Sequence, residues 1–358
     1  MKKPLFIVGT GRCGSTLLSN MVRQHPTCLS ISEFFAAAVD LGFRLEPIFS
    51  QTPISGEEFW GLIATHCPRQ DFMLNDGWVS PQLLYPIDGS CRYNKNTGLA
   101  PILFIMLPHL TEEPDALFDE LHAWVLQRPT VSAIEHTQAM FQYLAERFGK
   151  THWVERSGLT IVRVQQLLES FPEARFLHLV RDGRNCAISM NHHPTFRMMY
   201  IWNQQIQLLG IDPFEIDNRT DLGNLPDELR CLLPENLTPE AFWNYKISPS
   251  VFGHFWSEAI KLGISVLGQL PEERVLTLYY EDFLTNPVPQ VTALAEFVDG
   301  TALSTPEIEQ WIQKSAAMVG KPRSSQWEDL PLQEREELHQ ACLPGFEVLQ
   351  AYSSKIGR

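Results

Sequence analysis

The chain has 358 residues, of which 44% are hydrophobic and 20% charged, the composition of an ordinary globular protein with enough apolar residues for a large core. Its 28 basic and 42 acidic side chains give a net charge of -14 with histidine neutral, and no long basic run occurs. A nucleic-acid binder needs a basic face, so we expect no nucleic-acid partner, although a small basic pocket could still hold a small anion.

Neither the cysteines nor the apolar runs point to secretion or to a membrane. The seven cysteines are odd in number and lack the spacing of metal ligands, so we expect a reducing compartment and no metal site. The apolar run 4–8 is too short for a signal peptide, and no stretch approaches the ~20 apolar residues that a membrane helix needs. We therefore expect a cytoplasmic protein without membrane contact.

The first predicted unit is a strand, a glycine loop and a helix. Leu5-Phe6-Ile7-Val8 is continuously apolar and ends in glycine, which is typical of a strand covered on both faces in a parallel sheet. Apolar residues then recur at helical spacing over 17–22, until His25-Pro26 ends the helix.

Further strands and helices alternate along the chain. Strands are predicted at 151–155, 176–180 and 275–279, and helices at 161–168, at 183–190 and at 288–298, the last capped by Asn286-Pro287. This alternation predicts an α/β fold, with a P-loop-like central parallel sheet flanked by helices. Residues of about 36–150 and 191–250 are rich in proline, aromatic and polar residues. They are interpreted as large helical and loop insertions over the sheet, where ligand specificity usually resides, within a single domain, 1–358.

Gly9 to Thr16 has the frame of a phosphate-binding loop. Glycines let successive backbone N–H groups turn inward, and the following helix N-terminus attracts anions. A nucleoside triphosphatase would carry lysine at the position of Ser15. In this chain the positive charge of the loop lies at Arg12 instead. The alternative is a helix-entry loop that is merely rich in glycine, but its place directly after a buried strand favours phosphate binding.

This loop resembles the 5′-phosphosulfate-binding segment of sulfotransferases that use 3′-phosphoadenosine-5′-phosphosulfate (PAPS). The resemblance is to the branch of tyrosylprotein and bacterial enzymes, whose loop reads Arg-Ser-Gly-Thr-Thr. It implies PAPS as co-substrate, its desulfated form PAP as product, and a set of donor-binding residues in the loop. These are Gly11, Arg12, Cys13, Gly14, Ser15 and Thr16.

Three later segments resemble the same family. Arg181 and Ser189, eight residues apart, match the pair that clamps the 3′-phosphate, a role that suits a guanidinium and a hydroxyl. Arg156 takes the place of the lysine that contacts the bridging oxygen, while Tyr280 and Lys321 lie in segments that resemble donor contacts near the C-terminus. Taken alone, each could be a core aromatic or a solvated charge.

Glu33 is the candidate base. Some members of the family place a catalytic histidine where this chain has Gly158, so the base must come from elsewhere. In the tyrosylprotein branch a glutamate follows the loop arginine at the spacing of Arg12 and Glu33, which is 21 residues, just after the first helix and the next strand. The resemblance implies Glu33, Arg12 and Arg156 as catalytic residues; the alternative for Glu33 is to cap a helix over 36–38.

The expected reaction is transfer of a sulfuryl group from PAPS to a hydroxyl or amine of a small-molecule acceptor, such as a natural product. The acidic and aromatic insertions favour a neutral or cationic acceptor. A tyrosyl peptide or a carbohydrate stays open as acceptor, as do a P-loop kinase and a non-catalytic nucleotide-binding protein. The sequence predicts no oligomeric state.

Overall fold

A five-stranded parallel sheet lies at the centre of the computed structural model, which describes residues 3–40, 45–72, 74, 82–215, 222–223, 225–300, 305–320 and 326–355. The strand order is β2-β5-β1-β6-β7, and every pairing is parallel. The strands are β1 (Leu5–Val8), β2 (Cys28–Ser32), β5 (His152–Arg156), β6 (Arg175–Val180) and β7 (Val275–Tyr279). The predicted α/β class is therefore confirmed.

The central strands are apolar because both of their faces are covered. All four residues of β1 are buried, as are all five of β5, which is the pattern expected of a strand inside a parallel sheet. The core continues from Phe6 into an aromatic cluster with Trp153, Phe171 and Phe176, at ring-centroid distances of 5.1–6.0 Å.

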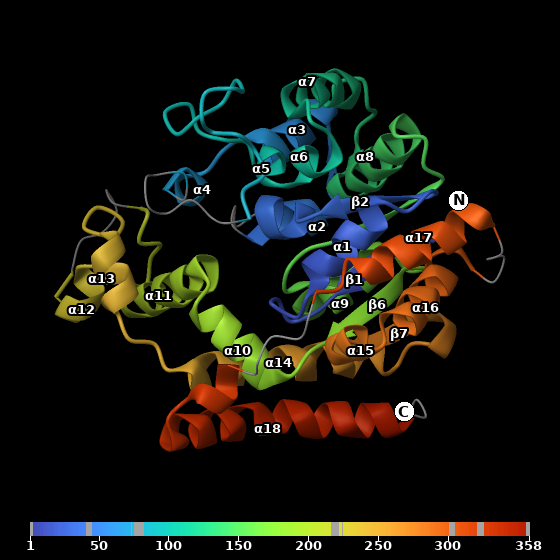
Figure 1. Ribbon diagram of the computed structural model, residues 1–358. Coiled ribbons are helices and arrows are strands. Elements are labelled where there is room, and N and C mark those ends of the chain that lie inside the picture. Colours follow the sequence, from blue (N-terminus) through green and yellow to red (C-terminus); the bar gives the residue numbers. More distant parts are fainter. Residues whose placement is uncertain are drawn as a thin grey trace.

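Helices surround the sheet (Figure 1). Those between β1 and β5 are α1 (Ser15–Arg23), the π-helical turn η1 (Phe35–Asp40), α2 (Leu45–Phe49), α3 (Gly56–Ala64), α4 (Pro68–Phe72), α5 (Pro101–Phe104), α6 (Met106–Leu110), α7 (Pro114–Val125) and α8 (Ala133–Arg147). Two short strands, β3 (Pro53–Ile54) and β4 (Val131–Ser132), pair antiparallel among them.

Between β5 and β7 the elements are η2 (Thr160–Arg163), α9 (Val164–Ser170), α10 (Gly183–Asn191), α11 (Pro194–Leu209), α12 (Asp227–Arg230), α13 (Pro239–Asn244), α14 (Pro249–Leu267) and η4 (Glu272–Arg274). After β7 come α15 (Tyr280–Thr285), α16 (Pro287–Asp299), α17 (Pro306–Ala317), η5 (Gln326–Asp329) and α18 (Leu332–Lys355).

The two predicted insertions form separate helical layers. The segment between η1 and α8 covers the β2 side of the sheet, while α11, α12 and α13 extend from one end of it (Figure 1). Helices α14 and α18 pack together along the opposite side (Figure 1). The insertions are thus helical, as expected, and they face each other across the edge of the sheet where the strands end.

Two local expectations need correction. Asn286 occupies the position before α16, but its side chain makes no capping hydrogen bond, and the helix begins on Pro287, whose missing N–H costs nothing there. The segment predicted as a helix over 161–168 is a 3₁₀ turn followed by α9.

Candidate active site

The candidate residues gather at the carboxyl ends of the five parallel strands. Register explains this: Ser32, the last residue of β2, pairs with Arg156, the last of β5, and Arg156 pairs with Ile7 near the end of β1. Ligands of open α/β sheets bind at this edge. The residues that directly follow or end the strands are Gly9, Glu33, Arg156, Arg181 and Tyr280.

The glycine loop is held by close aromatic contacts. Gly11 has a φ of +78°, and a β-carbon there would lie 2.6 Å from the ring of Phe196. Gly14, with a φ of +97°, would bring a β-carbon to 2.4 Å from the ring of Tyr280. Side chains at these two positions would be both strained and obstructed, so the loop needs glycine to turn tightly into α1.

Arg12, Arg181 and Ser189 lie together beside this loop. Arg12 Nε donates to Ser189 Oγ at 3.0 Å, and Arg181 Nη1 donates to the carbonyl oxygen of Arg12 at 2.9 Å. The Arg181 guanidinium also stands 4.9 Å from the centroid of the Tyr280 ring. Ser189 is presented by α10, whose first turn is capped by the carboxylate of Asp182.

Arg12 and Arg181 form a cationic site beside the glycine loop. Among the residues that the structure describes, no Asp or Glu forms an ion pair with Arg12 or Arg181. Burial, and next the neighbouring Arg181, lower the pKa of the Arg12 guanidinium. A bound anion would relieve both effects, so the geometry suits a phosphate or a sulfate ester.

Glu33 and Arg156 form a buried ion pair across the ends of β2 and β5. Arg156 Nη1 donates to Glu33 Oε1, and Arg156 Nη2 donates to Ser32 Oγ at 2.9 Å. The backbone N–H of Gly158 donates to Glu33 Oε2 at 2.8 Å. Glu33 and Arg156 are only 5% and 3% exposed, so three directed bonds hold the two side chains in one arrangement.

The structure does not use the Glu33 carboxylate as a helix cap. The backbone N–H of Ala36, in the first turn of η1, instead donates to Ser157 Oγ at 3.1 Å. Glu33 itself has a φ of +61°, an uncommon conformation for a residue with a side chain. That backbone conformation turns its carboxylate toward Arg156 and the cavity.

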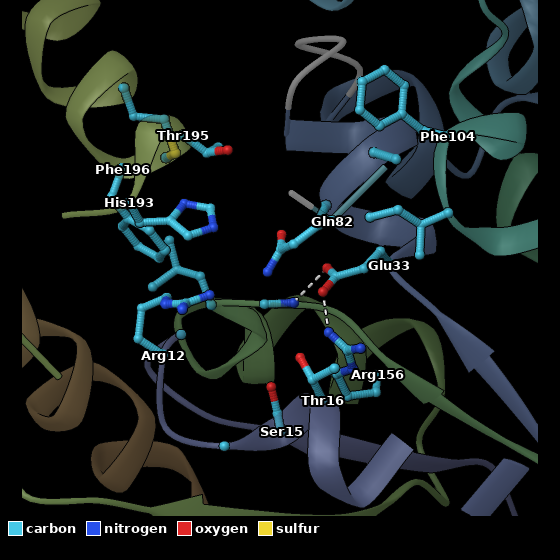
Figure 2. A pocket seen from close by; sticks show the side chains of 18 of the residues that line it. Arg12, Ser15, Thr16, Glu33, Gln82, Phe104, Arg156, His193, Thr195 and Phe196 are labelled. Carbon is cyan, nitrogen blue, oxygen red and sulfur yellow. Dashed lines mark hydrogen bonds and ion pairs between the residues drawn. The ribbon is translucent and has the colours of Figure 1, made fainter. Parts of the chain in front are cut away.

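One cavity contains most of the predicted residues (Figure 2). Its described lining includes Gly11, Arg12, Gly14, Ser15, Thr16, Glu33, Arg156 and Arg181, together with side chains that the sequence reasoning missed. The missed ones are Gln82, Phe104, Ile105, Leu159, Thr195, Phe196 and Met199. The recurrence of apolar residues at helical spacing in 194–209 was the signal that could have found the last two.

His193 also lines this cavity (Figure 2). It is 5% exposed, and neither ring nitrogen has a hydrogen-bond partner among the described residues. Burial, and next the charge of Arg12, lower the pKa of His193 to about 4, so the ring is neutral at neutral pH. A neutral imidazole can both donate and accept one hydrogen bond, which makes it a plausible contact for a ligand oxygen.

The other predicted donor contacts lie at the margin or outside the described residues. Cys13 is fully buried beneath the loop, where burial raises the pKa of its thiol. Ser189 and Tyr280 stand directly behind Arg12 and Gly14 rather than on the described cavity wall. Lys321 lies outside the residues that the structure describes.

Comparison with known protein families shows to which family the chain belongs. The family described as the sulfotransferase domain matches residues 106–340, well over half of the chain. The chain belongs to the sulfotransferase family. The resemblance stated from the motifs is thereby confirmed, whereas the branch is not resolved. The matched region begins after the glycine loop and Glu33, which follow the ends of β1 and β2.

Solved structures similar to this sulfotransferase are distant in sequence. The sulfotransferase domain of the curacin biosynthetic pathway is 14% identical, covers 95% of this chain and 97% of its own, and has a TM-score of 0.46. STF9 from Mycobacterium avium is 16% identical, with coverage of 99% and 76% and a TM-score of 0.43. A sulfotransferase from Alicyclobacillus acidocaldarius is 15% identical, with coverage of 98% and 95% and a TM-score of 0.37. Among curated proteins, none matches this chain significantly.

Within the described part of the chain, no helix is both long enough and apolar enough to cross a membrane.

Proposed function

We propose that this sulfotransferase takes the sulfuryl group of PAPS and transfers it to a hydroxyl of a small-molecule acceptor, which leaves PAP. The observation that carries the proposal is a single cavity in which the cationic pair Arg12 and Arg181 faces the ion pair of Glu33 and Arg156. These residues come from four strand ends far apart in the chain, which also supports one domain over 1–358.

The donor fits the cationic end of this cavity. Glycine at 11 and 14 keeps the loop backbone free of side chains, and the N-terminus of α1 follows directly, an arrangement suited to the 5′-phosphosulfate. Arg181 and Ser189 would hold the 3′-phosphate, with Tyr280 packed beneath the Arg181 guanidinium. Ser15 and Thr16 supply hydroxyls on the same wall.

The reaction then needs a base and a stabilised leaving group. The acceptor oxygen forms a bond to sulfur while the bond from sulfur to the bridging oxygen of PAPS breaks, and the departing group leaves as the 5′-phosphate of PAP. Glu33 accepts the hydroxyl proton, Arg156 compensates the charge that develops on the departing phosphate, and Arg12 stabilises the transferring group. An amine acceptor would use the same groups.

The cavity and the family disfavour the other readings of the sequence. Family membership favours sulfuryl transfer over a P-loop kinase or a non-catalytic nucleotide-binding protein. The cavity lining also includes the apolar side chains of Ala36, Ala37, Phe104 and Ile105, which supports a small molecule over a carbohydrate. A tyrosyl peptide would present a similar hydroxyl and is separated from a small molecule by the acceptor screen below.

The test is transfer of labelled sulfate from PAPS to a panel of phenols, alcohols, amines and tyrosyl peptides. Thermal unfolding with PAP or with ATP–Mg²⁺ measures donor class separately, because a ligand of the folded state raises the melting temperature. We expect PAP to stabilise the protein and ATP–Mg²⁺ to have little effect. Stabilisation by ATP–Mg²⁺ alone, or no transfer to any acceptor, would contradict the proposal.

Arg181→Ala tests the proposed contact between Arg181 and the 3′-phosphate of PAPS. Because this contact exists in both the ground state and the transition state, its loss should raise the KM for PAPS more than it lowers kcat. An unchanged KM for PAPS would remove Arg181 from the donor site.

A further inference from the structure

A second cavity adjoins the first along one face of α11, and the two share lining residues. Phe196 and Met199 line both cavities. The rest of the second cavity is lined by three helices: α11 with Tyr200, Trp202, Asn203 and Ile206, α14 with Val251, Phe252 and Phe255, and α4 with Arg69. Positions 196, 199, 203 and 206 recur at the spacing of one helix face. From residue 196 to residue 206 this face is about 15 Å long at the rise of an α-helix.

Phe196 is the point where the two cavities meet. Its ring packs against Gly11 of the donor loop on one side and stands 6.3 Å, centroid to centroid, from Phe255 on the other. Figure 2 places Phe196 and His193 on the wall opposite Glu33. Because Phe196 and Met199 line both cavities, a molecule whose reacting end lies between Glu33 and the donor loop would have to pass these two side chains to enter the second cavity.

The second cavity offers no net charge to a ligand. The one charged side chain among its described lining residues, Arg69, pairs with Asp212, and the Arg69 side chain is only 8% exposed. Its guanidinium stands over the rings of Trp202 and Phe214, at 5.9 and 5.5 Å from their centroids. A charged group brought here would lose its hydration without gaining a free counter-charge.

Polar contacts are few and well separated. His193 lies at the junction with both ring nitrogens unpartnered, and the Trp202 indole N–H is buried without a partner, both among the described residues. The remaining described wall is aromatic or aliphatic, apart from the exposed Asn203, the Tyr200 hydroxyl and the paired Arg69 guanidinium. Such a lining binds an apolar body and directs it through one or two hydrogen bonds.

We infer that the acceptor is a neutral, elongated apolar alcohol or phenol, whose hydroxyl lies at Glu33 and whose apolar body extends past Phe196 along α11 into the second cavity. His193 contacts the acceptor near its reacting end. This inference rests on the proposed function, since it names the acceptor of the same reaction.

The experiment is a series of para-alkylphenols: phenol, para-propylphenol, para-pentylphenol and para-octylphenol. The alkyl tail leaves the acidity of the hydroxyl nearly unchanged, so the series varies only the apolar surface to be buried. We expect kcat/KM to rise about two- to fourfold per methylene until the tail fills the second cavity. A phenol whose tail ends in a carboxylate or an ammonium group should be at least about tenfold poorer than its neutral counterpart.

Ile206→Trp and Leu208→Trp form a matched pair on the same helix. Ile206 lines the far part of the second cavity, whereas Leu208 is 43% exposed and lies outside the described lining. Ile206→Trp should end the rise at a shorter tail, and Leu208→Trp should reproduce the wild-type series. Calorimetric titration of the same phenols, with and without PAP, measures binding independently of turnover.

The outcomes separate this inference from the proposed function. Turnover or binding that does not depend on tail length, a preference for the charged tails, or equal effects of the two tryptophan variants would overturn the inference while leaving sulfuryl transfer intact. Length-dependent binding of the phenols without sulfuryl transfer would support the acceptor class and contradict the proposed reaction.

Discussion

Glu33→Gln tests the centre of the proposed mechanism. The substitution keeps the shape of the side chain and its ability to accept from the Gly158 N–H, but it removes both the base and the partner of Arg156. General base catalysis contributes about 10²- to 10⁴-fold, so kcat should fall by that factor. Because Glu33 and Arg156 are 5% and 3% exposed, losing one member of this pair should also lower the free energy of unfolding by about 3–5 kcal/mol.

PAP should recover much of that lost stability. In the variant, a phosphate of PAP can pair with Arg156 without competing with a carboxylate, so PAP should raise the melting temperature of Glu33→Gln more than that of the wild type. The assays are labelled-sulfate turnover at saturating PAPS and thermal unfolding with and without PAP.

Glu155→Gln is the matched control. Glu155 precedes Arg156 on β5 and is completely buried, but it bonds to Ser157 Oγ at 2.6 Å and lies outside the described cavity wall. Its variant should keep kcat close to the wild-type value. Near-normal turnover in Glu33→Gln, equal losses in both variants, or loss of PAP binding in Glu33→Gln would refute the assignment of Glu33 as base.

Three further predictions concern pH and the loop. Burial raises the pKa of Glu155 from 4.5 to about 8, so between these pH values the folded protein retains a proton that the unfolded chain has released. The free energy of unfolding should therefore fall as the pH rises from 4.5 to about 8. In denaturant titrations, Glu155→Gln should remove up to a few kcal/mol of that fall. Gly14→Ala forces a β-carbon to 2.4 Å from Tyr280, so the PAP affinity measured by calorimetry should drop. The control is Gly149→Ala, also at positive φ but with nothing within 4 Å of its β-carbon. It should lower the free energy of unfolding only by the backbone strain, about 1–3 kcal/mol. Because the pKa of His193 is about 4, the plot of kcat/KM against pH should show no inflection near pH 6.5. An inflection there that disappears in His193→Asn would contradict the neutral state of His193 at neutral pH.

The strands could be predicted where burial on both faces leaves a continuous apolar run. The strands Leu5–Val8 and Val275–Tyr279 have the predicted bounds, and β6 begins one residue earlier than expected. By contrast, β2 is implied only by the family resemblance, because Ser30 and Ser32 interrupt its apolar run. Ser30 is nevertheless 1% exposed, and its buried hydroxyl bonds to Ser19 of α1, a contact that local patterning does not reveal.

Most residues of the candidate site could be named from the sequence, but their contacts could not. The glycine loop and its arginine can be recognised from residue types alone, and spacing within a known family points to Glu33. The pairing of Glu33 with Arg156 depends on the parallel register of β2 and β5, which brings together residues 123 positions apart. The same is true of Phe196, whose place against Gly11 follows from how α11 packs on the loop.

Under the proposed function, the contact between Phe196 and Gly11 divides the acceptor wall into two parts with different freedom to change over evolution. A substitution at position 196 would change both the contact with the donor loop and the wall that faces the acceptor. Such a substitution must therefore preserve the binding of both the donor and the acceptor. Ile206 and Val251 line the second cavity and are not part of the described lining of the first. Descendants of this enzyme could therefore acquire new acceptors by drift at the far end of the cavity, while the chemistry at the loop stays the same.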